Sequence, residues 1–488
     1  MDNIDRGRRK FIQTVTYAGG TLIVGSAASY FLFKDSDTAD RVQTEITRHL
    51  KGKVIRDNLL IEEYRTDFGH TIRKEPRVIV IPKDDNDIAT TFKIAGELQI
   101  PLSIRGAGHT CFGQSLSDGG ILIVNYDTAP DVKLNNGTVS VHSKTRWMEL
   151  ERILNKLKLT SPVLTDYLEL TVGGTLSVGG YGLRSFRYGA QVDNIIEMEL
   201  ILPSGLKVKA SVDDNSDLFL YTLCGLGQLG FVNRIKFKPI RYRQYTLVFY
   251  IMCRSITEYI ATLKSIFSDD FAGGMDHFSA YWVNGTFIFE IGSSYEEANQ
   301  SKAETATKRI KKHLKFYKKT IIKDYHLYLH DVRKQWVEQW GISHHLWEDY
   351  IFNIDELEEF LNRTISTDNI QQQLKILPAL YLIACNSAQS KNIPFSPTYG
   401  RSNEMVYSVG FYYMVKRGDT DNLNVAKKQL EANMRHCIDI GGRPYLYGWH
   451  GLSESQKLQI YHDDYIKLKK LKQKYDPQHL LNPGVFIT

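Results

Sequence analysis

The chain has 488 residues, which at about 150 residues per domain is enough for two or three domains with cores of their own. Hydrophobic residues make up 42% and charged residues 24%, with 36 glycines and 13 prolines, so collagen-like, disordered and polytopic membrane proteins are excluded. The net charge of +6 is small for this length, and we expect no nucleic acid as a partner. The five cysteines are odd in number and scattered, so they predict no disulfide framework.

Residues 1–33 have the layout of a targeting segment. Four basic residues between Arg6 and Lys10 precede a stretch, 11–33, that has no charged residue. The run RRKFIQ, beginning at Arg8, resembles a twin-arginine export signal and predicts a place in the bacterial periplasm or cell envelope. Alternatively, residues 11–33 remain as a membrane anchor, because they are long enough to cross the hydrocarbon core.

Strand and helix signals alternate through residues 38–244. The hydrophobic patterns predict strands at 77–82, 100–104, 120–125, 139–141, 195–202, 206–210 and 231–237, and helices at 38–72, 84–98, 147–157 and 217–223. The glycine-rich composition stops near 241–244, and we predict a second domain at 245–440, in which 302–323 has the pattern of an amphipathic helix. Residues 441–488 end in compact turn sequences, so we expect them to pack back onto the first domain.

Three glycine-rich segments stand out, at 105–114, 171–180 and 225–230. Glycine lets the backbone turn tightly and present amide N–H groups to phosphate oxygens, so three such loops suit a long dinucleotide. The third segment matches G-x-G-x-x-G, but it follows a predicted helix and precedes a predicted strand. The nicotinamide-binding fingerprint needs the opposite order, which argues against a Rossmann domain.

Four segments carry a family resemblance: RGAGHTCFGQ from Arg105, LTDYLELTVGGTLS from Leu164, residues 217–233, and YDPQHLLNPG from Tyr475. They resemble cytokinin dehydrogenases, which belong to the FAD-linked oxidases of the vanillyl-alcohol oxidase and p-cresol methylhydroxylase type. The resemblance implies an α+β fold with a two-subdomain FAD-binding domain of mixed sheets and helices at 38–244. It also implies an α+β substrate domain with an antiparallel sheet at 245–440, and a return to the first domain at 441–488.

The resemblance also implies how a cofactor is held. FAD would be linked covalently to His109, the histidine of the family's G-x-G-H-[ST] motif, and no cysteine between 164 and 185 offers a second link. The other expected FAD-binding residues are Arg105, Gly106, Ala107, Gly108, Thr110, Gln114, Thr171, Ser177, Tyr181, Val232, Tyr445, Asn482 and Val485.

Asp166 matches the family's catalytic aspartate. A carboxylate that accepts the substrate N–H hydrogen bond keeps lone-pair density on nitrogen during hydride transfer, although an aspartate after threonine is also a common turn cap. The family pairs this aspartate with a glutamate, which Asn284 replaces in the best match, so the substrate can differ too. Trp347 and Leu446 match substrate-binding positions, Trp347 being equally compatible with a core role.

These features predict an FAD-dependent oxidoreductase. Its expected reaction is oxidation of a secondary amine in a small molecule, most simply cleavage of an alkylated adenine (a cytokinin) to adenine and an aldehyde, with oxygen or a quinone as electron acceptor. One alternative is a covalent-FAD oxidase of a sugar, alditol or other alcohol, and another is a flavin-binding envelope protein that is not an enzyme. His326 and His330 are spaced as on one helix face, but without a third ligand they predict no metal site.

Overall fold

The computed structural model describes residues 36–487 except 57–60, 127, 128, 268–273, 284, 297–300, 302, 303, 306, 309–317, 342, 366–375, 378, 390–392, 397 and 402–404. The predicted leader at 1–33 and Asn284 therefore lie outside the described residues. Within that part of the chain, no helix is both long and apolar enough to cross a bilayer.

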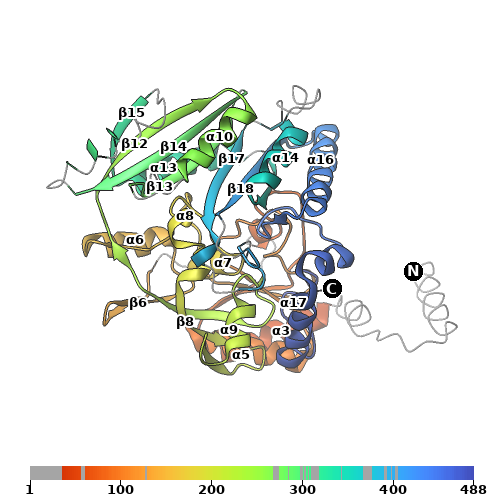
Figure 1. The fold of residues 1–488 in the computed structure, drawn as a ribbon. Coiled ribbons are helices and arrows are strands. Elements are labelled where there is room, and N and C mark those ends of the chain that lie inside the picture. The colour runs from red at the N-terminus through yellow and green to blue at the C-terminus, as the bar shows by residue number, and fades with distance from the viewer. Residues whose placement is uncertain are drawn as a thin grey trace.

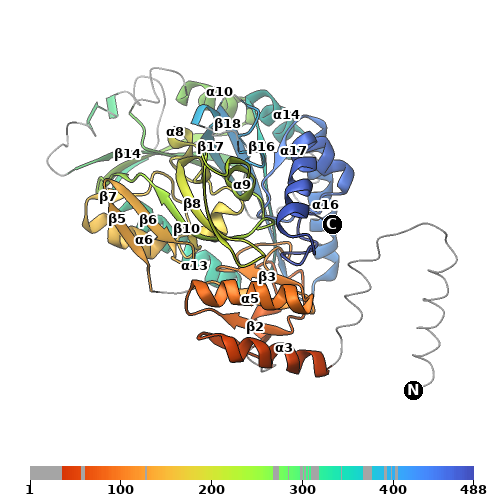
Figure 2. The same cartoon turned by 90° about the horizontal axis from the view of Figure 1, so that it is seen from below.

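A small sheet with two helices forms the first layer, at the bottom of Figure 2. Its strand order is β1-β2-β4-β3, with β1 antiparallel and the others parallel. The bounds are β1 Lys53–Ile55, β2 Val78–Ile81, β3 Leu102–Arg105, β4 Ile121–Val124, α3 Ser36–His49 and α5 Asp85–Leu98. Asp84 caps α5 by accepting hydrogen bonds from the N–H groups of Asn86 and Asp87. Ile88 and Phe92 of α5 pack on Val80 and Ile121, so the helix covers the sheet.

The second sheet is antiparallel, in the order β5-β6-β10-β8-β9. Its strands are β5 Val132–Asn135, β6 Thr138–His142, β8 Ile195–Ile201, β9 Lys207–Ser211 and β10 Phe231–Phe237. A two-stranded sheet pairs β7 (Leu159–Thr160) with β11 (Ile240–Arg241). The helices of this region are α6 Trp147–Lys156, α7 Val172–Leu176, α8 Ser185–Tyr188 and α9 Ser216–Thr222, with a 3₁₀ turn at Val192–Asn194.

The third sheet has eight antiparallel strands, in the order β15-β12-β14-β13-β17-β18-β16-β19 (Figure 1). The strands are β12 Tyr245–Cys253, β13 His277–Val283, β14 Thr286–Tyr295, β15 Lys318–Lys323, β16 Ser343–Phe352, β17 Leu380–Asn386, β18 Met405–Lys416 and β19 Arg443–Pro444. Helices α10 (Ile256–Ile266), α14 (Ile354–Ile365) and α16 (Thr420–Asp439) cover one face. Because side chains alternate along a strand, Phe287 and Phe289 of β14 enter this core and Glu290 points to the other face.

The end of the chain returns to the small sheet. After α17 (Glu454–Tyr475), the Leu102 N–H donates to the Leu480 carbonyl and the Asn482 N–H donates to the Leu102 carbonyl, each at 2.8 Å. The buried Lys472 ammonium forms an ion pair with Asp476 at 2.8 Å and donates to the carbonyl of Leu481. These bonds fix the C-terminal segment beside β3, where the first glycine-rich segment begins.

The structure confirms the α+β fold and most of the local predictions, including the hairpin of β8 and β9 and the helix-then-strand order around the third glycine segment. Two helix predictions were too long. The helix expected at 38–72 ends at His49, because Gly52 lies against the Ile81 carbonyl and the chain enters β1. Residues 318–323, expected within a helix, form β15, in which Ile321 and Ile322 pair with β12.

Candidate active site

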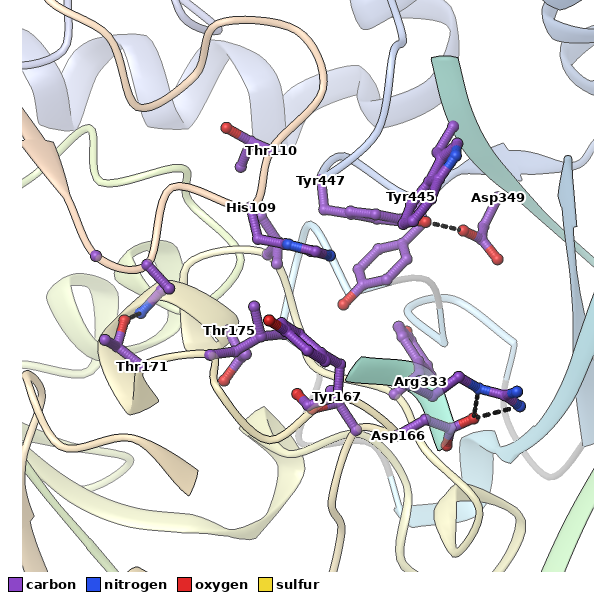
Figure 3. Close-up of a pocket in the computed structure, with 18 of the residues that line it drawn as sticks. His109, Thr110, Asp166, Tyr167, Thr171, Thr175, Arg333, Asp349, Tyr445 and Tyr447 are labelled. Carbon is purple, nitrogen blue, oxygen red and sulfur yellow. Dashed lines mark hydrogen bonds and ion pairs between the residues drawn. The ribbon is translucent and has the colours of Figure 1, made fainter. Parts of the chain in front are cut away.

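A cavity of ≈ 730 Å³ is lined by residues of all the larger parts of the fold. One side consists of the three glycine-rich segments, the other of β12, β13, β14, β17 and helix α13 (Tyr325–Trp340). Tyr445 and Asn482 of the C-terminal segment also line it. The glycine loops and the large sheet therefore enclose a single site (Figure 3).

The glycine segments approach one another too closely for side chains. A Cβ on Gly106 would collide with the Thr171 hydroxyl, which itself accepts a hydrogen bond from the Gly174 N–H at 3.3 Å. Gly227 has φ +67°, and a Cβ there would lie 2.6 Å from Nδ2 of Asn482. Glycine is thus required at both places by close contact, and at Gly227 also by backbone conformation.

Side-chain hydrogen bonds tie these loops to the C-terminal segment. The Gln114 amide donates to the carbonyls of Leu446, Tyr447 and Gly448 at 3.1, 3.1 and 2.9 Å. The Gly180 N–H donates to the Tyr445 hydroxyl at 2.9 Å. Asn482 accepts from the Ile104 N–H and donates to the Gly227 carbonyl, at 3.1 and 2.8 Å. The cavity wall therefore depends on residues far apart in the sequence.

Most residues predicted for the site line the cavity: Gly106, Ala107, Gly108, His109, Thr110, Gln114, Asp166, Thr171, Ser177, Tyr181, Val232, Trp347, Tyr445 and Asn482. Three do not. The Arg105 guanidinium packs against Gly108 and donates to the Thr66 carbonyl, Leu446 is buried and offers its carbonyl to Gln114, and Val485 lies in the hydrophobic core. These three residues therefore pack against other parts of the protein and do not border the cavity.

His109 is held between aromatic rings. Its imidazole centre lies 3.9 Å from that of Phe68 and 5.0 Å from that of Tyr167, and Trp347 is 5.9 Å away. Burial, with a smaller contribution from His345, lowers the pKa of His109 to about 3. The ring is therefore neutral and keeps a nitrogen lone pair, which bond formation to a carbon atom requires. Trp347 lies at this end of the cavity.

Asp166 occupies the opposite part of the cavity, beside α13 (Figure 3). Its Oδ2 accepts hydrogen bonds from Nη2 and Nε of Arg333, at 3.2 and 3.4 Å, and from the Tyr381 hydroxyl. Its Oδ1 is shielded from water and has no hydrogen-bond partner among the described residues. An unsatisfied buried carboxylate oxygen is rare, and at the wall of a cavity it suits a donor brought by a ligand.

Three charged groups of the cavity were not predicted from the sequence. Glu290 of β14 accepts from the Tyr325 hydroxyl, and burial raises its pKa to about 6. Asp349 of β16 accepts from the Tyr447 hydroxyl at 2.6 Å, and burial raises its pKa to about 6 as well. Arg333 is the third. The sequence did hold a signal for two of them. Glu290 is a carboxylate inside an otherwise apolar strand pattern. Asp349 lies two residues after Trp347, and residues two apart in a strand lie on the same face of the sheet.

The cavity fits FAD by its own features. All three glycine segments bring backbone close to the cavity, where a pyrophosphate needs N–H donors and no side chains. The buried Tyr181 hydroxyl lines the cavity without a partner among the described residues, so it is available to a ligand. None of the five cysteines lines the cavity. We found no cluster of metal-ligating residues in the described part of the chain.

Gly106→Ala tests the close approach of the first two glycine segments. The new methyl group should displace the Thr171 hydroxyl from the Gly174 N–H, an exchange that costs about 1–3 kcal/mol. We expect the flavin content of the purified protein, measured by the ratio of visible to ultraviolet absorbance, to fall at least about threefold. Gly96→Ala is the control, because a Cβ in this helical position meets only Gln478 at 3.7 Å. Equal flavin content in both variants would contradict the assignment.

Two family models match the chain. Residues 76–211 match an FAD binding domain, and residues 251–488 match the family described as cytokinin dehydrogenase 1, FAD and cytokinin binding. The first covers two of the glycine segments, and the second covers the large sheet, α13 and the C-terminal return.

Curated relatives and solved structures agree with these matches. Cytokinin dehydrogenase 3 of Arabidopsis thaliana is 39% identical over 197 residues, which span 38% of this chain and only 37% of the relative. Cytokinin dehydrogenase 2 of the same plant is 23% identical over 489 residues, or 92% of this chain and 96% of the relative. A chitooligosaccharide oxidase has the same fold, with a TM-score of 0.73 over 91% of this chain and 98% of the oxidase at 16% identity. Together, these comparisons show an FAD-binding domain and a similarity to cytokinin dehydrogenases that extends over most of this chain.

Proposed function

We propose that this protein oxidises a secondary amine in a small molecule and that its substrate is an adenine alkylated on the exocyclic nitrogen. The observation that carries the proposal is the carboxylate of Asp166 in the cavity, with one oxygen saturated by Arg333 and Tyr381 and the other unpartnered. Such a carboxylate can accept one more hydrogen bond, which an amine N–H would supply. The family match over residues 251–488 supports the choice of substrate.

The proposed reaction assigns separate roles to the cofactor and to Asp166. Bound FAD would supply the hydride acceptor. Asp166 accepts the hydrogen bond from the substrate N–H, through Oδ1 or through Oδ2 once the Tyr381 hydroxyl moves aside, and so keeps lone-pair density on nitrogen as the C–H bond breaks. The hydride leaves carbon for the acceptor that FAD would supply, the nitrogen gives its proton to Asp166, and water hydrolyses the resulting C=N bond to adenine and an aldehyde.

The walls of the cavity around Asp166 suit a flat, weakly polar molecule. Tyr281, Val332, Trp336 and Ile383 line this part, with Arg333 among them. An adenine ring can pack against such aromatic and aliphatic side chains, and they keep water from the reacting carbon. Trp347 lies beside His109 and Tyr412 in the same cavity, and Trp336 of α13 lies beside Arg333, so we propose that both indoles border the substrate.

We further propose that His109 forms a covalent bond to FAD. The neutral ring, held between Phe68 and Tyr167, supports this role. The two-electron acceptor that reoxidises the enzyme is proposed to be oxygen or a quinone.

For the leader, outside the described residues, we propose export or anchoring at a bacterial envelope. Fractionation of cells that produce the protein, with the Arg8-Arg9 pair changed to two lysines, would test this proposal.

A second candidate function is oxidation of an alcohol or sugar, and the Tyr447–Asp349 pair favours it. Tyr447 and Asp349 form a hydroxyl–carboxylate pair at 2.6 Å, and both line the cavity. The Tyr447 hydroxyl can pass its proton to Asp349 as it receives the proton of a substrate O–H, so the carboxylate is the base of this relay. Tyr447→Phe should then abolish reduction by alcohols. With an amine substrate, whose N–H is received by Asp166, the same change should lower the rate by less than about tenfold.

The proposed function is tested by the visible spectrum of the purified protein, before and after anaerobic addition of isopentenyladenine. Bleaching of the flavin bands, with adenine and an aldehyde recovered from the mixture, is the expected result. A flavin that stays oxidised with this amine but bleaches with an alcohol or an oligosaccharide would replace the amine by the second candidate. A flavin that no compound of these classes reduces would favour a binding protein.

A further inference from the structure

Arg333 forms an ion pair with Asp166, although the two residues lie far apart in the sequence. The Arg333 and Asp166 side chains are only 14% and 11% exposed, so the ion pair is largely removed from water. Burial is the largest single influence and lowers the pKa of Arg333, but Asp166, Tyr381 and Glu290 together outweigh it, so the pKa is raised overall. The guanidinium is therefore a fixed positive charge at the wall of the cavity.

Helix α13 holds the loop that carries Asp166 at two points. One turn before Arg333, the imidazole of His330 accepts a hydrogen bond from the Leu168 N–H at 3.1 Å. Burial lowers the pKa of His330, in keeping with its role as an acceptor. The spacing of three residues places His330 and Arg333 on the same face of the helix. The helix thus fixes both the backbone and the carboxylate of the 165–168 loop.

The guanidinium is itself confined by aromatic rings. Its central carbon lies 4.5 Å from the ring centre of Trp336, 5.2 Å from that of Tyr381 and 5.9 Å from that of Tyr281. A planar cation stacked among rings keeps one orientation, so the direction from which it donates to Asp166 is fixed as well.

We propose that Arg333 is a positioning residue that keeps Asp166 ionised and oriented, so that the carboxylate can accept the substrate N–H. This inference rests on the proposed role of Asp166. Removing the arginine would leave a buried carboxylate without its countercharge, and such a group binds a proton instead of staying charged. A protonated Asp166 would carry no negative charge, so it would accept the substrate N–H only weakly.

The pH dependence follows from the groups that face Asp166. Those in the large cavity are Arg333 of α13, Tyr381 of β17, Glu290 of β14 and Tyr412 of β18. Arg184, His277 and His326 line a small second pocket together with Asp166. Arg333 is the cation that forms an ion pair with Asp166, at 3.2 Å, and the two tyrosines remain neutral because burial raises their pKa values well above normal. Loss of the arginine would remove the cation of this ion pair, while the carboxyl group of Glu290 would remain as a neighbour of Asp166.

The test compares limiting rates of anaerobic flavin reduction by isopentenyladenine, from pH 5 to 9, in the holoenzyme and its variants. Arg333→Met should lose about tenfold to a hundredfold at pH 7 and recover at higher pH, since loss of an opposite charge moves a carboxyl titration by about 1–3 pH units. Arg333→Lys, which restores the charge, should recover most of the rate. Tyr381→Phe removes a neutral donor from the same oxygen and should slow reduction severalfold, with a smaller change in the pH dependence than Arg333→Met causes.

Lys334→Met is the matched control. It removes the adjacent cation of the same helix, whose side chain is 46% exposed and lies 3.8 Å from Glu169. An Arg333→Met profile that follows Lys334→Met in rate and in pH dependence would overturn the proposal. Asp166→Asn tests the proposed function separately. If this variant reduces its flavin as fast as the wild type, Asp166 has no role in the reaction, whatever the result for Arg333.

A substrate-free readout covers the case in which isopentenyladenine reduces no form of the enzyme. The visible spectrum of the oxidised holoenzyme responds to charge near the flavin, and we expect Arg333→Met to show a transition between pH 5 and 9 that Asp166→Asn/Arg333→Met lacks. A spectrum that is independent of pH in Arg333→Met would count against the ion pair as the support of the Asp166 charge.

Discussion

Asp166→Asn should slow flavin reduction by an amine about a hundredfold to ten-thousandfold, the range in which a positioned proton acceptor contributes to catalysis. The amide nearly preserves the shape of the carboxylate and can still bond to Tyr381. It carries no negative charge, however, so it accepts the substrate N–H only weakly and leaves Arg333 without its countercharge. The measurement is the limiting rate in anaerobic stopped-flow mixing, together with the apparent dissociation constant of the substrate.

Two further observations make this prediction specific. Asp131→Asn is the control, because Asp131 pairs with Arg234 on the surface, where its side chain is 41% exposed, and its loss should leave the rate unchanged. The dissociation constant should change far less than the rate, since Asp166 acts on the breaking bond and most of the binding surface is apolar. Asp166→Asn protein that reduces at the wild-type rate would exclude Asp166 from the reaction.

What the sequence could predict depends on the range of the interactions involved. The cap of α5 at Asp84, the hairpin around Pro203-Ser204-Gly205 and the helix that precedes the third glycine segment are set by residues close in the chain, and each was visible as a local pattern. The strand β15 was mistaken for part of a helix because its lysines and isoleucines fit either period over six residues. Only its pairing with β12 decides between them.

In the candidate site, too, local patterns could be predicted and long-range contacts could not. The three glycine segments could be assigned to one ligand from their composition and from the family resemblance, which also singled out His109 and Asp166. Arg333 lies 167 residues from Asp166 in the chain, so no local spacing relates the two. Glu290 reaches the cavity because alternation along β14 turns it away from Phe287 and Phe289, and the sequence does not say which face of that strand meets a ligand. Asn284 lies outside the described residues, so its proposed replacement of the family glutamate stays a prediction.

His109→Ala should abolish the covalent attachment of FAD while leaving the cofactor bound. The methyl side chain has no nucleophilic nitrogen, and the lining offers no cysteine to replace it. The glycine segments, Tyr181 and the C-terminal wall remain, so the variant should still elute yellow from gel filtration. Acid precipitation should then leave the colour in the supernatant, whereas wild-type protein should keep it in the pellet and fluoresce as a band in a denaturing gel.

The control for this result is His49→Ala, whose imidazole is 52% exposed on α3, far along the chain from the cavity residues. It should keep its flavin in the pellet, as the wild type does. Release of the colour from wild-type protein by acid would refute the covalent bond and leave His109 as a neutral aromatic wall between Phe68 and Tyr167. Retention in His109→Ala would point to another attachment atom, and the cavity-lining nucleophiles that remain include tyrosine hydroxyls such as that of Tyr181. Because burial raises the pKa of Tyr181 well above normal, its hydroxyl is a far weaker nucleophile than the neutral imidazole, which is why we assign the bond to His109.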